Sequence, residues 1–409
     1  MSGCGAEHGL ITVDQALDLI LEQTKALATE KLKLNQALNL YLAEDVYSNI
    51  NLPLFSQSAV DGYAICSQSA IESHTEFELI GEIQAGHFSE LHLKAGQAVR
   101  IFTGAKIPFG TTTVARQEIV KVIDTSKIKM TENLKVNADI RDVGEEISVG
   151  QLLTNKGQQL SVGAIASLSM AGISTVEVFQ YPKVAVVISG DEVASSIEDF
   201  TTGKIFDANA PLIQAWFQNQ GQQVEIFHVA DTETAVKALI QKLSKSYDLV
   251  LTTGGVSVGD YDFIRPVTLD VGFEQIFWKV KQKPGKPMFF AELTRADDSP
   301  CYLLGLPGNP AAVYVGMQIY TSTLLNALQG QKQQPKWFSA ILTHEVKLDA
   351  RERFLRMCAS FDQSILKVKS LSKQQSHMLS NLMQATCLVR IPAGVALSEG
   401  QIVQGLFIY

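Results

Sequence analysis

The stretch KVAVVISG, residues 183–190, decides the fold class of this chain. A continuous apolar run that ends in glycine is typical of a strand buried on both faces of a parallel sheet. Residues 207–221 follow as an expected amphipathic helix, with Asn209 as its N-cap and Pro211 in its first turn. The same alternation continues through QVEIFHVA, TETAVKALIQKLSKS and YDLVLTT. Strand, helix, strand, helix and strand predict a doubly wound α/β sheet.

The sequence on the C-terminal side of this core completes one domain and begins another. Further strands are expected in QIFWKV, MFFAEL and YLLGL. NPAAVYVGMQIYTSTLLNAL predicts a long helix that is apolar on nearly all sides and therefore buried. We assign residues 181–330 to an α/β domain. Short β-like segments follow the polar linker QGQKQQPKW, so residues 331–409 are expected to form a small barrel or sandwich.

On the N-terminal side, the residue pattern of the sequence changes twice between helical and β-like. Thr12 and Gln15 in TVDQALDLILEQTKAL fit a capping box, which predicts a helix near the start of the chain. Residues 47–142 consist of short β-like runs separated by Gly, Pro, Asn and Thr, which is typical of a small β-domain. We expect this β-domain to be inserted into a mixed helical domain made of residues 1–46 and 143–180.

Composition and charge exclude several classes of partner. The chain has 409 residues, 46% of them hydrophobic and 19% charged, as in a globular protein of several domains. Its net charge of −8 disfavours nucleic acid as a partner. The five cysteines form no C-x-x-C pair and no cluster with histidine, so we interpret them as reduced thiols. No signal-peptide pattern and no apolar run of about 18 residues occurs, which predicts a cytoplasmic protein without a membrane partner.

Carboxylates gather at the expected carboxyl ends of the α/β strands, where such folds bind their ligands. They are Asp191, Glu192, Asp207, Asp231, Asp260 and Asp262. Each one alone is typical of a helix cap. Beside Gly254, Gly255 and Gly259 the carboxylates as a set indicate an anion-binding site rather than helix caps alone, because glycines let backbone amides approach an anion closely. Carboxylates next to an anion need a mediator, and Mg²⁺ that bridges phosphates is the usual one.

Lysines form a second group in WKVKQKPGKPMFF, residues 278–290. They are Lys279, Lys281, Lys283 and Lys286. Strand alternation is expected to place the first three on one face, and the prolines stiffen the turn that follows. Such a cluster in an acidic protein suits a polyanion; the alternative is a solvated strand edge that discourages aggregation. Gly308 and Asn309 precede a helix whose amides are expected to point at the same rim.

Common catalytic and anion-binding motifs are missing from the sequence. It contains no G-x-x-x-x-G-K-[ST], no G-x-G-x-x-G with an acidic ribose ligand, no G-x-S-x-G and no H-E-x-x-H. The sequence therefore supports neither a P-loop NTPase nor a dinucleotide enzyme, and neither an α/β-hydrolase nor a zinc protease of the usual kind.

Six segments of the chain occur together, and in the same order, in a known family. They are SAVDGYAI (58–65), RIFTGAKIP (100–108), ISGDEV (188–193), TTGGVSVGDYD (252–262), KPGKP (283–287) and GLPGNP (305–310). From about Leu10 to its C-terminus the chain resembles the molybdopterin molybdenumtransferases, the bacterial MoeA family, to which the C-terminal domain of gephyrin is related. The resemblance implies an elongated homodimer of four-domain subunits with an inserted β-domain, an α/β domain and a C-terminal β-barrel.

The resemblance also implies a reaction. Molybdate is inserted into the dithiolene of adenylylated molybdopterin and AMP is released, with Mg²⁺ as the assisting cofactor. The active site of the family lies between the α/β domain of one subunit and motifs of its partner. The matching catalytic positions are Asp61, Thr103, Glu192, Asp231, Asp262, Lys279 and Lys283, of which Glu192, Asp231 and Asp262 are the expected metal ligands.

The candidate substrate-binding residues combine this resemblance with the glycine and lysine patterns described above. They are Gly254, Gly255, Ser257, Gly259, Lys286, Gly308, Asn309, Arg356 and Ser376. Asp260 is interpreted as a structural neighbour of Asp262. The expected ligands of this set are adenylylated molybdopterin and molybdate.

Two alternatives come from other functional classes. One is a non-catalytic scaffold of the gephyrin kind. The other is a molybdopterin-binding or adenylylating protein, because the adenylyltransferases of the pathway share the glycine-rich α/β domain. The flanking domains and SAVDGYA favour the transferase. The pathway adenylyltransferase then becomes a candidate partner, in addition to a second copy of the chain.

Overall fold

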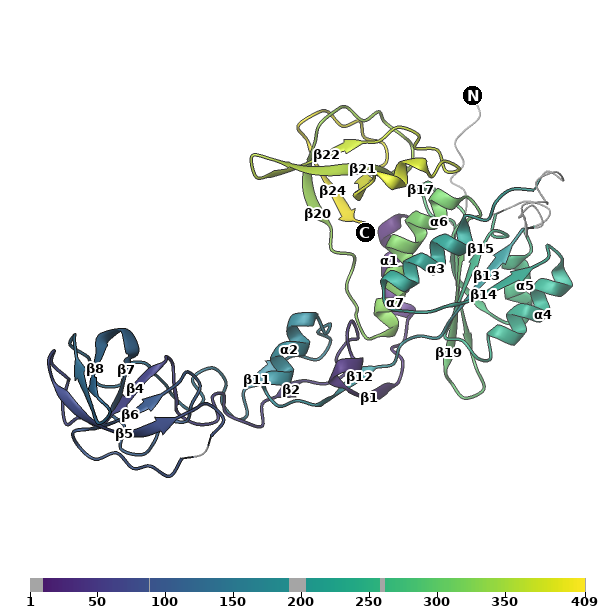
Figure 1. Cartoon of the computed structure of the whole chain (residues 1–409). Helices are drawn as coiled ribbons and strands as arrows, with labels where there is room; N and C mark the ends of the chain where they lie inside the picture. Colours follow the sequence, from purple (N-terminus) through teal and green to yellow (C-terminus); the bar gives the residue numbers. More distant parts are fainter. Residues whose placement is uncertain (1–9, 88, 191–203, 258–261, 409) are drawn as a thin grey trace. The chain divides into compact units, whose positions relative to one another are not determined.

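The computed structural model describes residues 10–87, 89–190, 204–257 and 262–408 (Figure 1). The chain divides into two compact units. The first contains Met1–Glu30, Asn39–Tyr41 and Phe179–Tyr409, and the second contains Lys31–Leu38 and Leu42–Val178. The chain passes between the units within strands β1 (Thr29–Lys33) and β12 (Thr175–Phe179), and again on either side of Asn39–Tyr41.

A six-stranded sheet forms the centre of the first unit. Its strand order is β14 (Glu225–Val229), β13 (Val184–Ser189), β15 (Leu249–Thr253), β19 (Pro300–Leu306), β18 (Phe289–Thr294) and β16 (Glu274–Trp278). The first four strands pair in parallel, whereas β18 is antiparallel to both of its neighbours. Because β14 and β15 lie on opposite sides of β13, the switch point is at the carboxyl ends of β13 and β15. The predicted doubly wound α/β domain is confirmed.

Helices cover both faces of this sheet (Figure 1). On one face, α4 (Glu233–Leu243) and α5 (Ile264–Val271) share a core with Val187 of β13. On the other face, α1 (Val13–Gln23), α3 (Asn209–Asn219), α6 (Pro310–Gly316) and α7 (Ser322–Leu328) share a core with Val186. Alternate side chains of β13 thus enter two cores, which explains why this strand is apolar throughout.

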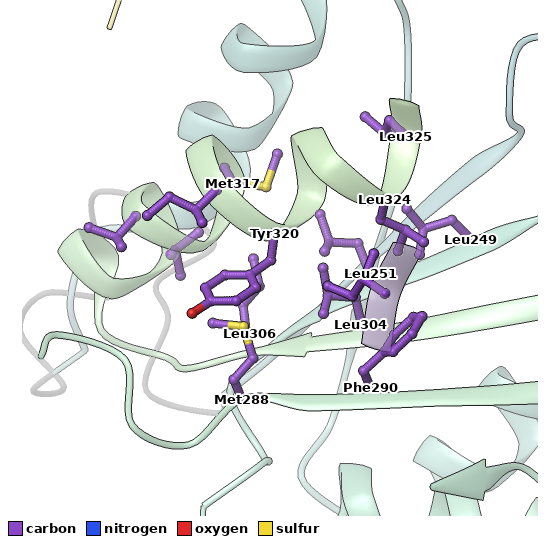
Figure 2. Close-up of a cluster of buried hydrophobic side chains, with 14 of the residues drawn as sticks. Leu249, Leu251, Met288, Phe290, Leu304, Leu306, Met317, Tyr320, Leu324 and Leu325 are labelled. Carbon is purple, nitrogen blue, oxygen red and sulfur yellow. The ribbon is translucent and has the colours of Figure 1, made fainter. Parts of the chain in front are cut away.

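The expected long buried helix is present as one run. A π-helical segment, Met317–Thr321, joins α6 to α7. Figure 2 shows the run above the strands, with Tyr320 directed toward Leu306 and Met288. These side chains belong to the largest cluster of buried apolar residues. Burial on several sides explains the absence of a polar stripe from this segment of the sequence.

Helix α1 begins as the sequence predicts but lies elsewhere than the domain prediction placed it. Thr12 accepts a hydrogen bond from the amide of Gln15, whose side chain bonds back to Thr12, so the capping box is confirmed. Residues 1–46 were expected to form a domain with 143–180. Leu17 and Ile20 are instead fully buried in the α/β core and assign the helix to the first unit. A capping box fixes where a helix starts, and its apolar stripe fits several possible cores.

The C-terminal residues form a closed β-barrel, also within the first unit. The ring consists of β21 (Glu352–Asp362), β22 (Ile365–Ser370), β20 (Phe338–Leu342), β24 (Ile402–Phe407) and β23 (Cys387–Ile391). Pairing of β21 with β23 closes the ring. A further short strand, β17 (Gln282–Lys283), pairs with β21 from outside, although its residues belong to the α/β part of the sequence. The barrel predicted by the resemblance is confirmed, and one strand of the neighbouring domain extends it.

The second unit contains the inserted β-domain. Its main sheet has the order β7 (Thr113–Arg116), β4 (Gly62–Ile65), β6 (Gln97–Ile101), β5 (Glu76–Ile83), β9 (Lys127–Met130) and β8 (Val120–Asp124). Two short pairs accompany it, β3 (Gln57–Ser58) with β10 (Ile140–Arg141) and β2 (Val46–Tyr47) with β11 (Leu152–Thr154). Helix α2 (Val162–Met170) follows. In neither unit is any described helix long and apolar enough to cross a membrane.

Candidate functional site

A glycine loop follows β15 at the switch point of the sheet. Gly254 and Gly255 have φ angles of +83° and +63°, in the left-handed region. A Cβ on Gly254 would lie 2.9 Å from Ser189 Oγ, and one on Gly255 would lie 2.6 Å from Cγ1 of Ile264. Both positions therefore require glycine for backbone conformation and for space. Ser257 is exposed at the end of the described part of this loop, and Gly259 lies outside the described residues.

The loop after β19 joins this group. A Cβ on Gly308 would lie 3.6 Å from Cα of Gly254, so the two backbones are in close approach. Asn209 at the start of α3 donates from Nδ2 to the carbonyl of Gly308 at 2.9 Å. Chain segments that follow β13, β15 and β19 thus meet at one place, as the position of the switch point requires.

The predicted cap of α3 is wrong, because Ala208 occupies the N-cap position and the side chain of Asp207, just before it, supplies the capping bonds. Asp207 Oδ1 accepts hydrogen bonds from the amides of Asn209 and Ala210 at 2.8 and 3.0 Å, so Asp207 caps the helix. Asn209 is its first helical residue instead. Both residue types are good caps, and the sequence alone ranks them equally. Oδ1 of Asn209 is a buried oxygen beside the glycine loops, and the described residues supply no hydrogen-bond donor to it.

The structure describes two of the three predicted metal ligands. Asp262 lies between the glycine loop and α5, and Asp231 directly precedes Thr232, the cap of α4; both are partly buried. Glu192 lies outside the described residues, as do Asp191 and Asp260. Within the described ranges, no three His, Cys, Asp or Glu residues are grouped closely enough to hold a metal ion. The shared metal site stays a prediction.

Trp278 links the lysine segment to the glycine loop. Its indole Nε1 donates to the carbonyl of Val256 at 2.9 Å. The ammonium of Lys279 lies 4.1 Å from the centroid of the same ring, and the guanidinium of Arg265 lies 4.0 Å from it. An indole ring attracts cations through its electron-rich faces. The ring therefore holds two positive groups next to the loop that was predicted to receive an anion.

The lysine segment does not form the single strand that its alternation predicted. Strand β16 ends at Trp278, and Lys279 has a φ of +71°, which breaks the extended run. Extended structure resumes in β17, where Lys283 pairs with Arg353 of the barrel. The ammonium of Lys283 contacts Oδ2 of Asp349 at 3.0 Å, and Lys286 is partly buried. The segment thus bridges the α/β sheet and the barrel.

Gln282 fixes the turn after β17 from the inside. Its side chain is fully buried, and Nε2 donates to the carbonyls of Pro284 and Gly285 at 3.1 and 3.2 Å. Its Oε1 accepts a hydrogen bond from the hydroxyl of Tyr320. Burial raises the pKa of Tyr320 well above its usual value, so the hydroxyl keeps the proton that it donates. The turn that presents Lys283 and Lys286 is therefore anchored to the buried helix.

The amides at the start of α6 do not face an anion site. Pro310 has no N–H, and the amide of Ala311 donates to the carbonyl of Ser376 at 3.0 Å. The amides of Ala312 and Val313 donate to the carbonyl of Asn309. The expectation that this helix offers its N-terminus to a ligand is wrong, because a loop of the barrel occupies that end. Gly308 still lies beside the glycine loop through its close approach to Gly254.

Arg356 supports that barrel loop and does not face a ligand. Its side chain is 2% exposed. The guanidinium donates to the carbonyls of Lys373, Gln375 and Met378 and to Oε1 of Gln374. Burial lowers the pKa of Arg356, and several acceptors stabilise its charge. The predicted substrate contact by Arg356 is therefore corrected to a structural role: it holds the loop that carries Ser376.

Asp61 and Thr103 form a pair within the second unit. Oδ1 of Asp61 accepts hydrogen bonds from the amide and the hydroxyl of Thr103 at 2.9 and 2.8 Å. These two bonds hold the pKa of Asp61 below its usual value. A Cβ on Gly62 would lie 1.9 Å from the carbonyl oxygen of Ala115, so only glycine fits beside Asp61. The carboxylate of Asp61 and the hydroxyl of Thr103 are thus held next to each other in a fixed arrangement.

Three residues that shape the site were not predicted from the sequence. Trp278, Gln282 and Tyr320 hold the glycine loop and the lysine turn in place. An indole next to Lys279 is a signal that sequence offers, because tryptophan is the ring that best accepts a cation. Gln282 between Lys281 and Lys283 signals an inward polar side chain by strand alternation. The bond from Tyr320 joins distant positions and leaves no local signal.

Fold and site together define a class of protein. It is a multidomain α/β protein with glycine loops at the switch point of its sheet, lysines beside them, and a barrel joined to the lysine segment. Three family models match consecutive parts of the chain: “MoeA N-terminal region (domain I and II)” at residues 11–172, “Probable molybdopterin binding domain” at 185–327 and “MoeA C-terminal region (domain IV)” at 339–407.

Individual relatives agree with these models over nearly the whole chain. A molybdopterin molybdenumtransferase of Haemophilus influenzae is 34% identical, across 93% of this chain and 94% of the relative. One of Staphylococcus epidermidis is 32% identical, across 94% and 92%. The crystal structure of a molybdopterin biosynthesis moeA protein from Pyrococcus horikoshii superposes with a TM-score of 0.80 at 26% identity, covering 98% of this chain and all of that one. The chain belongs to the molybdopterin molybdenumtransferase family.

Proposed function

We propose that this protein catalyses the insertion of molybdate into adenylylated molybdopterin. The reaction breaks the phosphoanhydride, releases AMP and water, and transfers molybdenum to the two dithiolene sulfurs of the pterin. The observation that carries the proposal is the junction at Trp278, which holds Lys279 beside a glycine loop at the switch point of the sheet. A site of this kind receives the phosphates of a ligand at backbone amides and neutralises their charge with ammonium groups.

Each part of the site then has a role. Gly254 and Gly255 leave room for a phosphorylated ligand, since any side chain there meets Ser189 or Ile264. Lys279, Lys283 and Lys286 offset the charge of phosphate and of molybdate, which binds as the second substrate. The sulfurs of the pterin are the ligands that the transferred molybdenum requires. The protein has to bring the two anions together, and cationic groups that are fixed beforehand do this most effectively.

Mg²⁺ is part of this proposal as the cofactor. Oxygen donors are the chemistry that this ion prefers, and Asp231, Asp262 and the unsatisfied Oδ1 of Asn209 are such donors in the described part of the crevice. Together with Glu192 from the SGDE motif, Asp231 and Asp262 would hold the ion. When bound, it supplies positive charge that polarises the phosphoanhydride.

The active species is proposed to be a homodimer, with the pathway adenylyltransferase as a further partner that delivers the adenylylated pterin. Support comes from the second unit, which exposes many large apolar side chains. They include Tyr47, Leu54, Phe109, Val122, Val143, Val149, Val162 and Met170. A second copy of the chain that packs against these side chains would remove apolar area from water. A second subunit also offers Asp61 and Thr103 a role, because family resemblance assigns both to the active site.

Replacing Asp262 by alanine tests the assigned chemistry. We expect Asp262→Ala to lower the rate of AMP release from adenylylated molybdopterin by a factor of about 100 or more at saturating molybdate and Mg²⁺, since one charged group of a transition-state site is removed. Chromatography of AMP over time measures this rate. Asp270→Ala, on the exposed end of α5, is the matched control and should release AMP normally.

Two results would contradict the proposal. Near-normal AMP release by Asp262→Ala removes this residue from the reaction. Absence of molybdate-dependent AMP release from the unmodified protein favours the two alternatives, because a scaffold or a pterin carrier releases none.

A further inference from the structure

A carboxylate of the barrel contacts one of the lysines proposed to bind the anionic substrates. Oδ2 of Asp349 lies 3.0 Å from Nζ of Lys283, and the side chains of the two residues are 21% and 53% exposed, respectively. Asp349 precedes β21, the barrel strand that pairs with β17. The ion pair therefore sits where the barrel meets the lysine segment.

Asp349 is the fixed member of this pair. Its Oδ1 accepts a hydrogen bond from the amide of Arg351 at 3.1 Å, and its own carbonyl accepts one from the amide of Gly394 at 2.8 Å. The amide of Arg351, followed by the ammonium of Lys283, holds the pKa of Asp349 below its usual value, so it stays ionised at neutral pH. Lys283 is half exposed on a flexible stem and can leave the carboxylate without disturbing the backbone.

We propose that Asp349 competes with the anionic substrate for the ammonium of Lys283 and thereby limits the affinity of the site for small oxyanions such as molybdate. The inference rests on the proposed function, because it concerns a lysine of the proposed polyanion site. An oxyanion that binds Lys283 has to displace a carboxylate that already neutralises it, and weakly charged anions do so least well. Asp349 is thus a residue that limits the affinity of Lys283 for small dianions such as molybdate.

The proposal differs from a purely structural ion pair in the sign of one effect. If the contact only fastens the barrel to the lysine segment, removing its charge leaves anion binding unchanged or weaker. If Asp349 competes for Lys283, removing its charge makes anion binding tighter. Asp349→Asn separates the two cases, since the amide oxygen still accepts the hydrogen bond from Arg351 and the shape of the side chain is kept.

The experiment is an isothermal calorimetric titration of the full-length protein at low ionic strength. Sodium molybdate is the ligand in one series, and sodium sulfate is the ligand in the other. We expect Asp349→Asn to bind both anions about two- to five-fold more tightly than the unmodified protein, the range of an ion pair that is partly exposed. Lys283→Ala should weaken binding, and the double variant should lose the gain. Asp362→Asn is the matched control, because Asp362 pairs with Lys367 at 2.6 Å elsewhere on the barrel.

Each outcome decides the inference. Equal or weaker binding by Asp349→Asn overturns it, as does a gain that persists without Lys283 or an equal gain in Asp362→Asn. Failure of every variant to bind either anion also overturns it, because the uncovered Lys283 should then have produced a measurable site. The titration requires no turnover. A protein that releases no AMP but gains affinity in Asp349→Asn loses the proposed function alone, whereas normal AMP release without that gain refutes the inference alone.

Discussion

Single residues decide this site through space as much as through charge. Gly254 and Gly308 carry no functional group, yet the absence of side chains lets the backbones of their two loops approach each other closely. Trp278 has no place in common motifs, but one indole bonds the loop and attracts Lys279 and Arg265. Arg356, in contrast, carries a charge, but its guanidinium donates hydrogen bonds to backbone carbonyls of the same barrel. Residue type alone therefore does not separate ligand contacts from supports.

Gly254→Ala should lower both stability and ligand binding. The φ of +83° costs a non-glycine residue about 1–2 kcal/mol, and the new Cβ at 2.9 Å from Ser189 Oγ forces that side chain or the loop to shift. We expect at least a ten-fold loss of pyrophosphate affinity by calorimetry. Gly221→Ala is the control, because Gly221 has a φ of +76° with open space around it. Equal pyrophosphate affinity in Gly254→Ala and Gly221→Ala would show that crowding at the loop is unimportant.

At the scale of elements, local patterns predict well and contacts between distant elements do not. The strands of the α/β sheet follow from apolar runs, and the capping box of α1 from Thr12 and Gln15. The cap of α3 was misplaced because Asp207 and Asn209 are equally good caps two residues apart. The start of α6 was misjudged because its amide partner, Ser376, lies on another domain. Propensity describes an element, whereas its partners depend on the folded chain.

Tyr320→Phe tests the anchoring of one element by another. Loss of the hydroxyl leaves Oε1 of Gln282 buried without its donor, which costs about 1–3 kcal/mol of the free energy of unfolding. Urea denaturation measures this loss, and hydrogen exchange should rise at residues 283–286 specifically. Tyr314→Phe, in the same helical run but without a bond to the turn, should leave that exchange unchanged. Unchanged exchange in both variants would disprove the anchor.

At the scale of the whole molecule, one arginine joins three parts of the first unit. Arg390 of β23 contacts Glu352 of β21 and Asp14 of α1, and its guanidinium lies 5.4 Å from the ring of Trp337 in the linker. A cavity of about 490 Å³ adjoins these charges. Burial raises the pKa of Glu352, and the contact with Arg390 only partly offsets this effect. The ionised carboxylate thus depends on its arginine.

Arg390→Met should therefore destabilise the protein in a pH-dependent manner. Removing one partner of a buried ion pair costs about 3–5 kcal/mol while Glu352 stays ionised. A buried carboxyl with a raised pKa contributes stability at low pH and loses it as the pH rises through that pKa. The loss should accordingly be larger at pH 8 than at pH 5 in thermal denaturation. Arg390→Met combined with Glu352→Gln should recover most of it; a loss that is independent of pH would contradict this role.

The domain plan of the whole chain was predicted in its broad outline. Texture changes in the sequence indicated an inserted β-domain, an α/β domain and a C-terminal barrel, and all three are present. The domain to which α1 belongs was not predicted, because the apolar face of the helix gives no information on which hydrophobic core it packs against. Likewise, alternation along the lysine segment suggested one strand and could not show that this segment crosses from the sheet to the barrel.

That crossing strand sets a limit on how the protein can be divided. β17 is encoded within the α/β domain but completes its hydrogen bonds on β21, so a cut at the linker near residue 331 would leave Lys283 on an unpaired edge. The barrel is therefore no exchangeable module. In a chimera between two relatives, residues 279–287 and the barrel would have to come from the same parent.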